Sequence, residues 1–340
     1  MSLLHFEGLN VVPTTLLSLP NISALACSGF ANGNGRFGGK TLDLDWSGDY
    51  YSVTFSDNHE TIIVGAALKS DNAGAPGGGE FLRLRDGATI HLKFVMAADG
   101  EIAGYRGDGA LLGTTTGMGL TYGVWRYFEV KAKINNSTGS VVIKSGGVEV
   151  LNLSDVDTQN GGNAYCNVVY FQGDTANKVF AEHLYFCSTA GSTCNDFLGD
   201  VRVDLLTPNA AGSHTDFTPS AGSNFQNVDD AGVNDGDTTY NQGTDVGDKD
   251  SYGLSDMPSP PANTVIFGTR TLAVMRKTDV GARGAKILTI AGATEHASAE
   301  IALSDSYGLC GDLLELNPAD SDSYEDADIN ALEAGVEVAS

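Results

Sequence analysis

The sequence predicts an all-β protein of two sandwich domains, and three observations support this prediction. Residues 125–132 alternate between apolar and mixed side chains, and a period of two residues is typical of a half-buried strand. Asn135–Gly139 and Ser145–Gly147 supply turn residues between this strand and two further alternating stretches. The chain of 340 residues contains Gly 43 and Pro 9, which favours many turns and short strands, and its length suits two domains.

In the first half, alternation predicts a central meander over 121–153, with strands at Trp125–Ala132, Ser140–Lys144 and Val148–Leu153. Three antiparallel strands with one packed face need a second sheet to cover them, so we expect a sandwich. Its other strands are predicted at Leu3–Gly8, Asp49–Phe55, Thr61–Ala67, Phe81–Arg85, Thr89–Ala97, Asn163–Gln172 and Val179–Cys187. The polar segment Ser188–Cys194 has no apolar period, and we place the end of a first domain, 1–194, there.

The second half predicts a smaller β-sandwich over 195–340. Strands are expected at Phe197–Leu206, Thr264–Arg276, Ala285–Ile290, Glu300–Leu303, Leu313–Leu316 and Gly335–Ala339, with a brief helical turn at Ala327–Leu332. Between them, the region 227–257 is acidic, with eight aspartates and one lysine, Lys249. Carboxylates at this density could bind Ca²⁺, but the spacing of an EF-type loop is missing. A solvated loop with short strands is the favoured interpretation, and no other cofactor or metal is expected.

Charge and cysteine content exclude several classes of function. The formal net charge is −24 and no lysine or arginine cluster occurs, so we expect no nucleic-acid binding. The five cysteines are scattered and odd in number, which argues against a disulfide scaffold and favours a reducing compartment. Pro13 and Pro20 interrupt the apolar stretch near the N-terminus, and a basic region is lacking there. We therefore expect neither a signal peptide nor membrane insertion.

Several short motifs imitate functional sites. Gly33–Gly38 satisfies G-x-G-x-x-G but leads into a strand-like stretch, whereas dinucleotide binding needs a helix there. Arg106-Gly107-Asp108 is too short a motif to indicate cell adhesion, and His183, beside Glu182, lacks partners at a metal or catalytic spacing. Paired carboxylates on one strand, as in glucanases, are also missing, with Asp43-Leu44-Asp45 the nearest approach. We expect no enzymatic activity and no catalytic residues.

Two turn-rich stretches are the candidate ligand-binding loops. Ser70–Glu80 contains Asp71 and Asn72, and Tyr105–Gly119 lies close to a second aromatic residue, Tyr122. Loops at the ends of sandwiches often carry ligand contacts, and tyrosine rings can stack on sugars. A simple connector is the alternative interpretation of both stretches.

Two resemblances extend these predictions. The opening LLHFEG, the later RFGGKTLDL and the central meander resemble laminin-G-like and concanavalin-like jelly rolls. Over nearly its full length the chain also resembles tailed-bacteriophage virion proteins with an N-terminal concanavalin-like domain. The passages that carry this second resemblance are Asp196–Asp230, Gly247–Pro258, Ala273–Arg283 and Ala327–Val338.

The second resemblance implies a non-enzymatic virion structural protein, assembled in the host bacterial cytoplasm and present as a homo-oligomer among other virion proteins. A tail-tip or tail-fibre position is expected, where the protein would contribute to assembly and to host-surface contact. A capsid decoration protein and a glycan-binding module that recognises host surface glycans are the alternatives.

Overall fold

The computed structural model describes residues 2–9, 16–31, 33, 35–70, 79–174, 178–230 and 234–340. The described residues form two compact units. The first contains residues 2–9 and 21–203, and the second contains residues 16–20 and 204–340. These units differ from the predicted division at residue 194 in two places, since 195–203 belongs to the first unit and 16–20 to the second.

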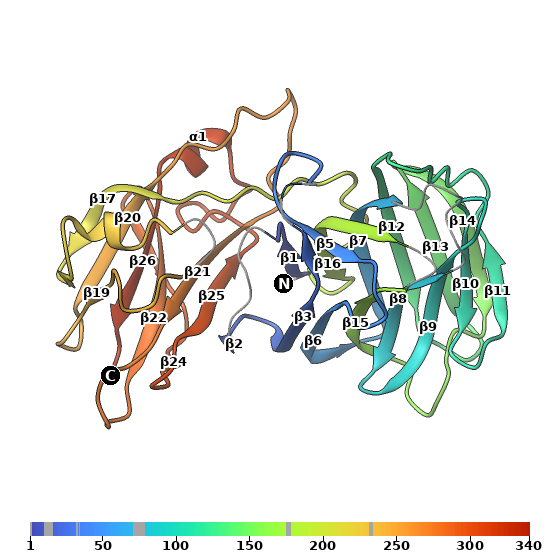
Figure 1. The fold of residues 1–340 in the computed structure, drawn as a ribbon, viewed down its shortest axis with the longest axis horizontal. Coiled ribbons are helices and arrows are strands. Elements are labelled where there is room, and N and C mark those ends of the chain that lie inside the picture. The colour runs from blue at the N-terminus through green and yellow to red at the C-terminus, as the bar shows by residue number, and fades with distance from the viewer. Residues whose placement is uncertain are drawn as a thin grey trace. The chain divides into compact units, whose positions relative to one another are not determined.

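The first unit is a sandwich of two large, mainly antiparallel sheets (Figure 1). The eight-stranded sheet has the order β14-β13-β12-β7-β16-β5-β4, and β1 also pairs with β16. Its strands are β1 (Leu3–Glu7), β4 (Phe30–Ala31), β5 (Thr41–Leu44), β7 (Thr61–Ser70), β12 (Arg126–Lys133), β13 (Gly139–Ser145), β14 (Val148–Val156) and β16 (Val179–Ser188). The predicted meander is therefore confirmed as β12–β13–β14, and the apolar strand β7 is central.

The seven-stranded sheet has the order β11-β10-β9-β8-β15-β6-β3. Its strands are β3 (Ile22–Ser28), β6 (Tyr50–His59), β8 (Gly79–Asp86), β9 (Thr89–Met96), β10 (Ile102–Arg106), β11 (Leu111–Thr114) and β15 (Cys166–Gln172). The prediction of a turn-rich stretch over Tyr105–Gly119 is wrong in part, because this stretch contains the end of β10 and all of β11.

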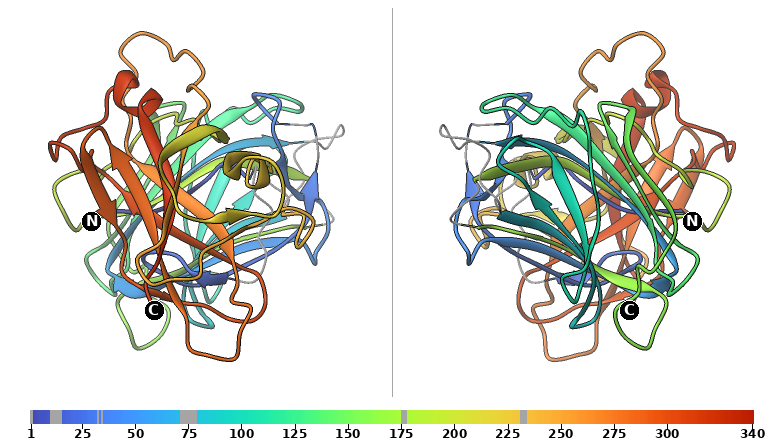
Figure 2. Two further views of the ribbon diagram at one scale, coloured as in Figure 1. Left: turned by 90° about the vertical axis from the view of Figure 1, so that its left-hand side faces the viewer. Right: turned by 90° about the vertical axis from the view of Figure 1, so that its right-hand side faces the viewer.

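Aromatic side chains from both sheets fill the space between them. Phe128 of β12 packs edge-on against Phe81 of β8 at 5.6 Å and against Phe94 of β9 at 6.4 Å between ring centroids. Phe186 of β16 meets Phe55 of β6 in the same way at 6.1 Å. Figure 2 (right) shows the teal and green strands of the two sheets in separate layers. The inward face of each strand is thus used for the core, and the outward faces are left for other contacts.

Segment 195–203 covers part of the outer face of the eight-stranded sheet, and we call it the covering segment. Alternation predicts a strand at Phe197–Leu206, but these residues form no strand. The reason is that their backbone N–H groups donate to side chains of the sheet. Leu198 donates to the Tyr185 hydroxyl at 3.1 Å and Gly199 to Glu129 Oε1 at 2.8 Å.

The second unit contains a smaller pair of packed sheets. Its six-stranded sheet consists of β17 (Pro208–Thr215), β20 (Lys249–Leu254), β22 (Gly284–Ala291), β23 (Thr294–Ala297), β24 (Ile301–Ala302) and β26 (Leu332–Val338). A three-stranded sheet consists of β2 (Leu16–Ser18), β21 (Thr269–Met275) and β25 (Gly308–Leu314). Ile287 of β22 and Cys310 of β25 share one apolar cluster, which joins these two sheets.

The remaining elements of the second unit are short. They are the strands β18 (Thr218–Pro219) and β19 (Asn241–Gln242), the 3-10 helix η1 (Asn224–Asn227) and the helix α1 (Asp326–Asn330). The predicted helical turn at Ala327–Leu332 thus overlaps α1. Among the described residues, no helix has the length and apolar character needed to cross a membrane. The all-β prediction, with a first sandwich of two large sheets followed by a smaller sheet region, is confirmed.

Candidate functional site

The outer face of the seven-stranded sheet carries a row of tyrosines and cations that runs across five neighbouring strands. Tyr170 of β15 lies opposite Arg83 of β8, Arg83 lies opposite Lys93 of β9, and Lys93 lies opposite Tyr105 of β10. On the other side, Tyr170 is paired with Ser52 of β6. We call these residues, with the neighbouring Tyr50 and Arg85, the tyrosine–arginine row. Their strands can be followed by their labels in Figure 1.

The row follows from alternation of inward and outward side chains, which is clearest in β6 and in part of β8. In β6 the burial pattern switches at every residue from Tyr50 to Phe55, so that Tyr51 points into the core while Tyr50 points out. In β8, Leu82 and Leu84 are buried and Arg83 and Arg85 are partly exposed. The pleat therefore places apolar residues inside and the tyrosines and cations outside, in register from strand to strand.

Tyr170 is held between an aromatic ring and two guanidinium groups. The Tyr50 ring stacks on it with centroids 5.5 Å apart and an angle of 7° between the ring planes. Arg83 and Arg85 lie with Cζ at 5.9 and 5.1 Å from the Tyr170 centroid. Because β6 and β8 flank β15 on opposite sides, both faces of the Tyr170 ring are occupied. Tyr170 therefore presents its ring edge and hydroxyl to the outside.

The cations of the row are only partly neutralised. Arg83 Nε donates to Glu80 Oε1 in an ion pair. The Arg83 side chain is 27% exposed and the Glu80 side chain is 17% exposed. Arg85 Nε is buried and has no hydrogen-bond partner in the described ranges of the chain. Lys93 Nζ lies 5.9 Å from the Tyr105 ring centroid and, within the described part of the chain, forms no ion pair. The row thus offers phenol hydroxyls and charged N–H groups to a ligand.

An exposed tryptophan lies at one end of the same sheet. Trp46 follows β5 and exposes 65% of its surface. Its backbone carbonyl accepts a hydrogen bond from Asp49 N at 2.9 Å, and Gly173 N, just after β15, donates to the Asp49 carbonyl at 2.7 Å. The turn is therefore fixed to the ends of β15 and β6, close in sequence to Tyr50.

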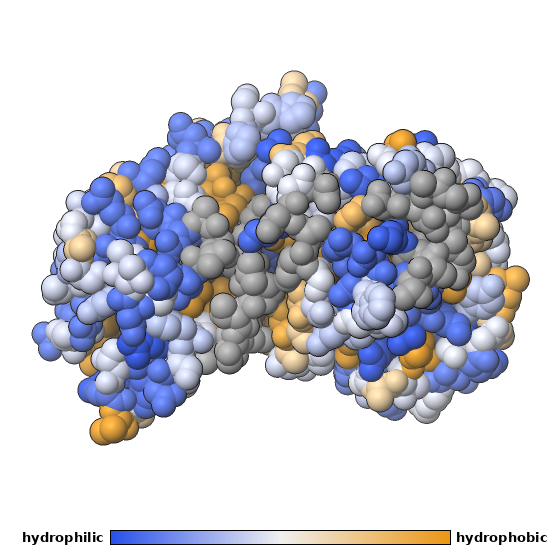
Figure 3. All heavy atoms as spheres, in the orientation of Figure 1, coloured by the Kyte–Doolittle hydropathy of each residue, from blue (hydrophilic) through white to orange (hydrophobic). Residues whose placement is uncertain are grey.

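Figure 3 shows hydrophilic residues over most of the visible surface, with hydrophobic ones scattered among them.

The predicted ligand residues do not come together at one place. Tyr105 lies in strand β10 rather than in a loop, and it is part of the tyrosine–arginine row. Tyr122 is 54% exposed and forms an isolated bridge with Ser70 at the end of β7, in the eight-stranded sheet. Asp71 and Asn72 lie outside the described residues.

The sequence reasoning missed Tyr50, Tyr170, Arg83, Arg85 and Lys93. A usable signal was present, because the predicted strand Phe81–Arg85 places both arginines on one face. The same alternation places Lys93 on the outer face of Thr89–Ala97. What alternation could not supply was the identity of the strand beside each of these, which decides whether the residues form a row.

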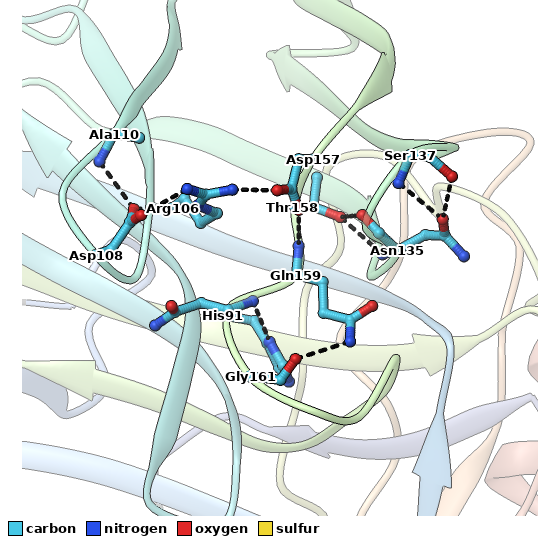
Figure 4. Close-up of polar contacts among 11 residues, drawn as sticks. His91, Arg106, Asp108, Ala110, Asn135, Ser137, Asp157, Thr158, Gln159 and Gly161 are labelled. Carbon is cyan, nitrogen blue, oxygen red and sulfur yellow. Dashed lines mark hydrogen bonds and ion pairs between the residues drawn. The ribbon is translucent and has the colours of Figure 1, made fainter.

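The Arg106-Gly107-Asp108 tripeptide is part of the fold. Arg106 forms ion pairs with both Asp108 and Asp157, as Figure 4 shows. The Arg106 guanidinium holds the pKa of the Asp108 carboxyl at about 2. A Cβ at Gly107 would collide with the carbonyl of Ile90, so this position requires glycine. The side chains of the tripeptide are bound to each other and to a neighbouring turn.

Glu182 and His183 lie on the outer face of the other sheet and are packed under the covering segment. His183 is 6% exposed, and its Nδ1 accepts a hydrogen bond from Val203 N at 3.1 Å. Burial, with Arg36 and Arg202 nearby, lowers the pKa of His183 to about 4. Burial also raises the pKa of Glu182. Although His183 Nε2 lies 3.4 Å from Glu182 Oε1, these opposite shifts indicate a neutral histidine in the folded state. The residue spacing around His183 predicts neither a metal nor a catalytic role, and the structure shows its side chain packed beneath the covering segment.

The aspartates of the acidic region mostly accept hydrogen bonds within the fold. Asp250 Oδ2 accepts from Asn224, Asn241 and Tyr252, and Asp237 pairs with Arg276. Within the part of the chain that the structure describes, no three His, Cys, Asp or Glu side chains are grouped so as to hold a metal ion.

Burial raises the pKa of the thiols of Cys166 and Cys310 to about 12, so both are protonated at neutral pH.

Comparisons with known proteins found distant structural likenesses only. No family model matches the chain, and no curated protein matches it. Among solved structures, the cellulose-induced protein Cip1 is similar with a TM-score of 0.36 and 16% identity, over 48% of this chain and 89% of Cip1. The carbohydrate recognition domain of Emp47p is similar with a TM-score of 0.35 and 11% identity, over 54% of this chain and 93% of that domain's chain. The carbohydrate esterase vb_24B_21 from Shiga toxin-encoding bacteriophage phi24B is similar with a TM-score of 0.33 and 13% identity, over 48% of this chain and 90% of the esterase chain. At these scores and identities we draw nothing about function from them.

Proposed function

We propose that the protein is a non-enzymatic glycan-binding protein and that the tyrosine–arginine row is its binding site. The observation that carries this proposal is the in-register line of Tyr170, Arg83, Lys93 and Tyr105 across the outer sheet face. Phenol hydroxyls and guanidinium N–H groups can hydrogen-bond to sugar hydroxyls, and aromatic surfaces can pack on the C–H groups of sugar rings. Such a mixture of rigid aromatic and polar groups is typical of sites that bind small polar ligands.

The site is rigid before any ligand arrives. Tyr170 is fixed by the Tyr50 ring on one side and by two guanidinium groups on the other. Side chains that are already ordered lose little conformational entropy when they bind a ligand, which favours affinity. Trp46, exposed at the end of the same sheet, supplies a free indole ring for a longer chain of sugars.

Replacing Tyr170 by alanine is expected to weaken glycan binding by about tenfold or more, equivalent to about 1.4 kcal/mol. The substitution removes a hydroxyl and also releases Tyr50, Arg83 and Arg85 from their stacked positions. Binding would be measured with the full chain on a glycan array and then by calorimetry with the best ligand. Tyr122→Ala is the matched control, because Tyr122 is an exposed tyrosine of the same unit outside the row, and we expect it to bind as the wild type does.

Three results would contradict the proposal. If the protein binds no glycan, the proposed function is wrong. If Tyr122→Ala loses binding while Tyr170→Ala keeps it, the proposed site is wrong. Incubation of the protein with its ligand, followed by analysis of chain length, tests the non-enzymatic part. Shortening of the polysaccharide would show that the row or another site is catalytic.

The sequence resemblance supports a second proposal about where this binding takes place. The passages Asp196–Asp230 and Ala327–Val338 belong to the resemblance with tailed-bacteriophage virion proteins. On that basis we propose a virion component, at the tail tip or fibre or on the capsid surface, where repeated copies would contact host glycans. Mass spectrometry of purified particles tests this proposal, and absence of the protein from them would contradict it.

A further inference from the structure

We infer that the sugar polymer bound by the tyrosine–arginine row is anionic and carries carboxylate or sulfate groups. This inference rests on the proposed glycan-binding function and adds the chemical class of the ligand. It starts from a contrast in charge. The whole chain has a formal net charge of −24, whereas the row places Arg83, Arg85 and Lys93 together on one sheet face. Glu80 offsets part of this charge through its ion pair with Arg83.

The arrangement of these cations is unfavourable for folding alone. Arg83 and Lys93 are directly opposite each other on neighbouring strands, and like charges in that position destabilise a sheet. Arg85 adds a third positive charge two residues from Arg83 on the same face. A bound anion would relieve this repulsion, so the cluster is better explained by a ligand than by stability.

Two of the three cations also have unused bonding capacity. Arg85 Nε is buried without a hydrogen-bond partner among the residues that the structure describes, which is uncommon for a buried N–H group and costs free energy. Lys93 Nζ contacts the Tyr105 ring, and among the described residues no carboxylate pairs with it. Guanidinium groups bind planar oxyanions with two parallel N–H bonds, and an ammonium group adds a point charge beside them.

The direction of the row fits a linear polymer. Adjacent strands lie about 4.8 Å apart, so Tyr170 and Tyr105, separated by three strand intervals, are about 14 Å apart across the sheet. Arg83 and Lys93 occupy the two strands between them. A short stretch of polysaccharide laid across the strands would meet the Tyr170 edge, then two positive charges, then the Tyr105 ring.

The test compares polymers that differ only in charge. Polygalacturonate and its carboxyl-reduced derivative share one backbone, and a sulfated galactan separates sulfate from carboxylate as the bound group. The wild-type protein is expected to bind a charged polymer at least tenfold more tightly than the reduced one. Because the attraction is electrostatic and partly exposed to solvent, the preference should fall steeply as salt is raised.

The double variant Arg85→Gln/Lys93→Met removes two of the three charges and leaves the Arg83–Glu80 pair in place. It is expected to lose the preference for the charged polymer while it keeps the weaker affinity for the reduced one. Lys133→Met is the control, because it makes the same lysine-to-methionine replacement in β12 of the other sheet, and it should keep the preference. Thermal unfolding of each variant verifies that it is folded.

The failures of this inference and of the proposed function are distinguishable. If the wild type binds polygalacturonate and its reduced form equally and Tyr170→Ala binds neither, the inference of an anionic ligand is wrong. The same result would support the tyrosine–arginine row as a glycan-binding site. A charge preference that survives in Arg85→Gln/Lys93→Met would also overturn the inference. Binding to none of the three polymers and to no glycan on an array would overturn both proposals.

Discussion

Replacing Gly65 by alanine is expected to lower the free energy of unfolding of the first unit by about 3 kcal/mol, at the upper end of the usual cost of overpacking a core. Gly65 lies in the centre of β7, opposite Tyr185 of β16. A Cβ at this position would lie 2.5 Å from Cδ1 and 2.6 Å from Cζ of the Tyr185 ring. The ring cannot stay where it is, because such contacts are far inside van der Waals distance.

Displacing Tyr185 disturbs more than one contact. Its hydroxyl donates to Glu129 Oε1 at 2.5 Å and accepts from Leu198 N at 3.1 Å, and its ring stacks on Tyr127. Glu129 is itself buried, so loss of the Tyr185 hydroxyl removes one of its donors and leaves the N–H of Gly199 as another. We therefore expect the covering segment to loosen, which faster amide hydrogen exchange at Leu198 and Gly199 would reveal.

Gly104→Ala is the matched control for this substitution. Gly104 also lies in a strand of the first unit, but the nearest atom to its added Cβ would be Phe94 Cε1 at 3.6 Å, an ordinary contact. Urea unfolding of both variants measures the difference. Equal stability of the Gly65→Ala and Gly104→Ala proteins would show that Tyr185 can move without cost and would contradict the proposed packing.

The second large effect expected is a loss of about 3 kcal/mol of stability on acidification from pH 6.5 to pH 4, caused by His183 alone. Folding lowers the pKa of His183 from 6.5 to about 4. Between these values the unfolded chain binds a proton that the folded chain does not. The stability is therefore complete above pH 6.5 and is lost as the pH falls toward the pKa of the folded state.

His183→Asn tests this assignment. His183 has a φ of 49°, a left-handed conformation that asparagine tolerates well, and an asparagine oxygen can accept the hydrogen bond from Val203 N. Unfolding free energies of the wild type and the variant would be measured at intervals from pH 7 to pH 4. The stability of the wild type relative to the variant should fall by about 3 kcal/mol as the pH falls. A difference that stays constant with pH would show that His183 does not titrate in this way.

Much of the fold could be predicted from the sequence, because alternation is a local signal. It identified the meander β12–β13–β14 and the central strand β7. It failed at Phe197–Leu206, where the alternation is present but the backbone donates to the side chains of Tyr185, Glu129 and His183. A contact between residues so far apart in sequence leaves no local pattern, so the covering segment could not be predicted.

The candidate site was predictable in chemistry but not in place. Tyr105 was predicted as an aromatic ligand residue in a loop, and it lies in β10, within the row. The row depends on β15 pairing with β8 and β6, strands that come much earlier in the chain. Since a single sequence does not reveal which distant strands are neighbours, Tyr170 and Arg83 could not be placed together.

The pairing of strand β2 limits when the three-stranded sheet can form during translation. Its residues Leu16–Ser18 run parallel to β25, at Leu309 and Cys310, although β1 before it and β3 after it belong to the first unit. A ribosome makes β2 long before its partner β25, because most of the sequence lies between the two strands. The three-stranded sheet therefore remains incomplete until β25 has emerged, and a fragment that starts at Asp204 would leave one border of β25 open to another molecule.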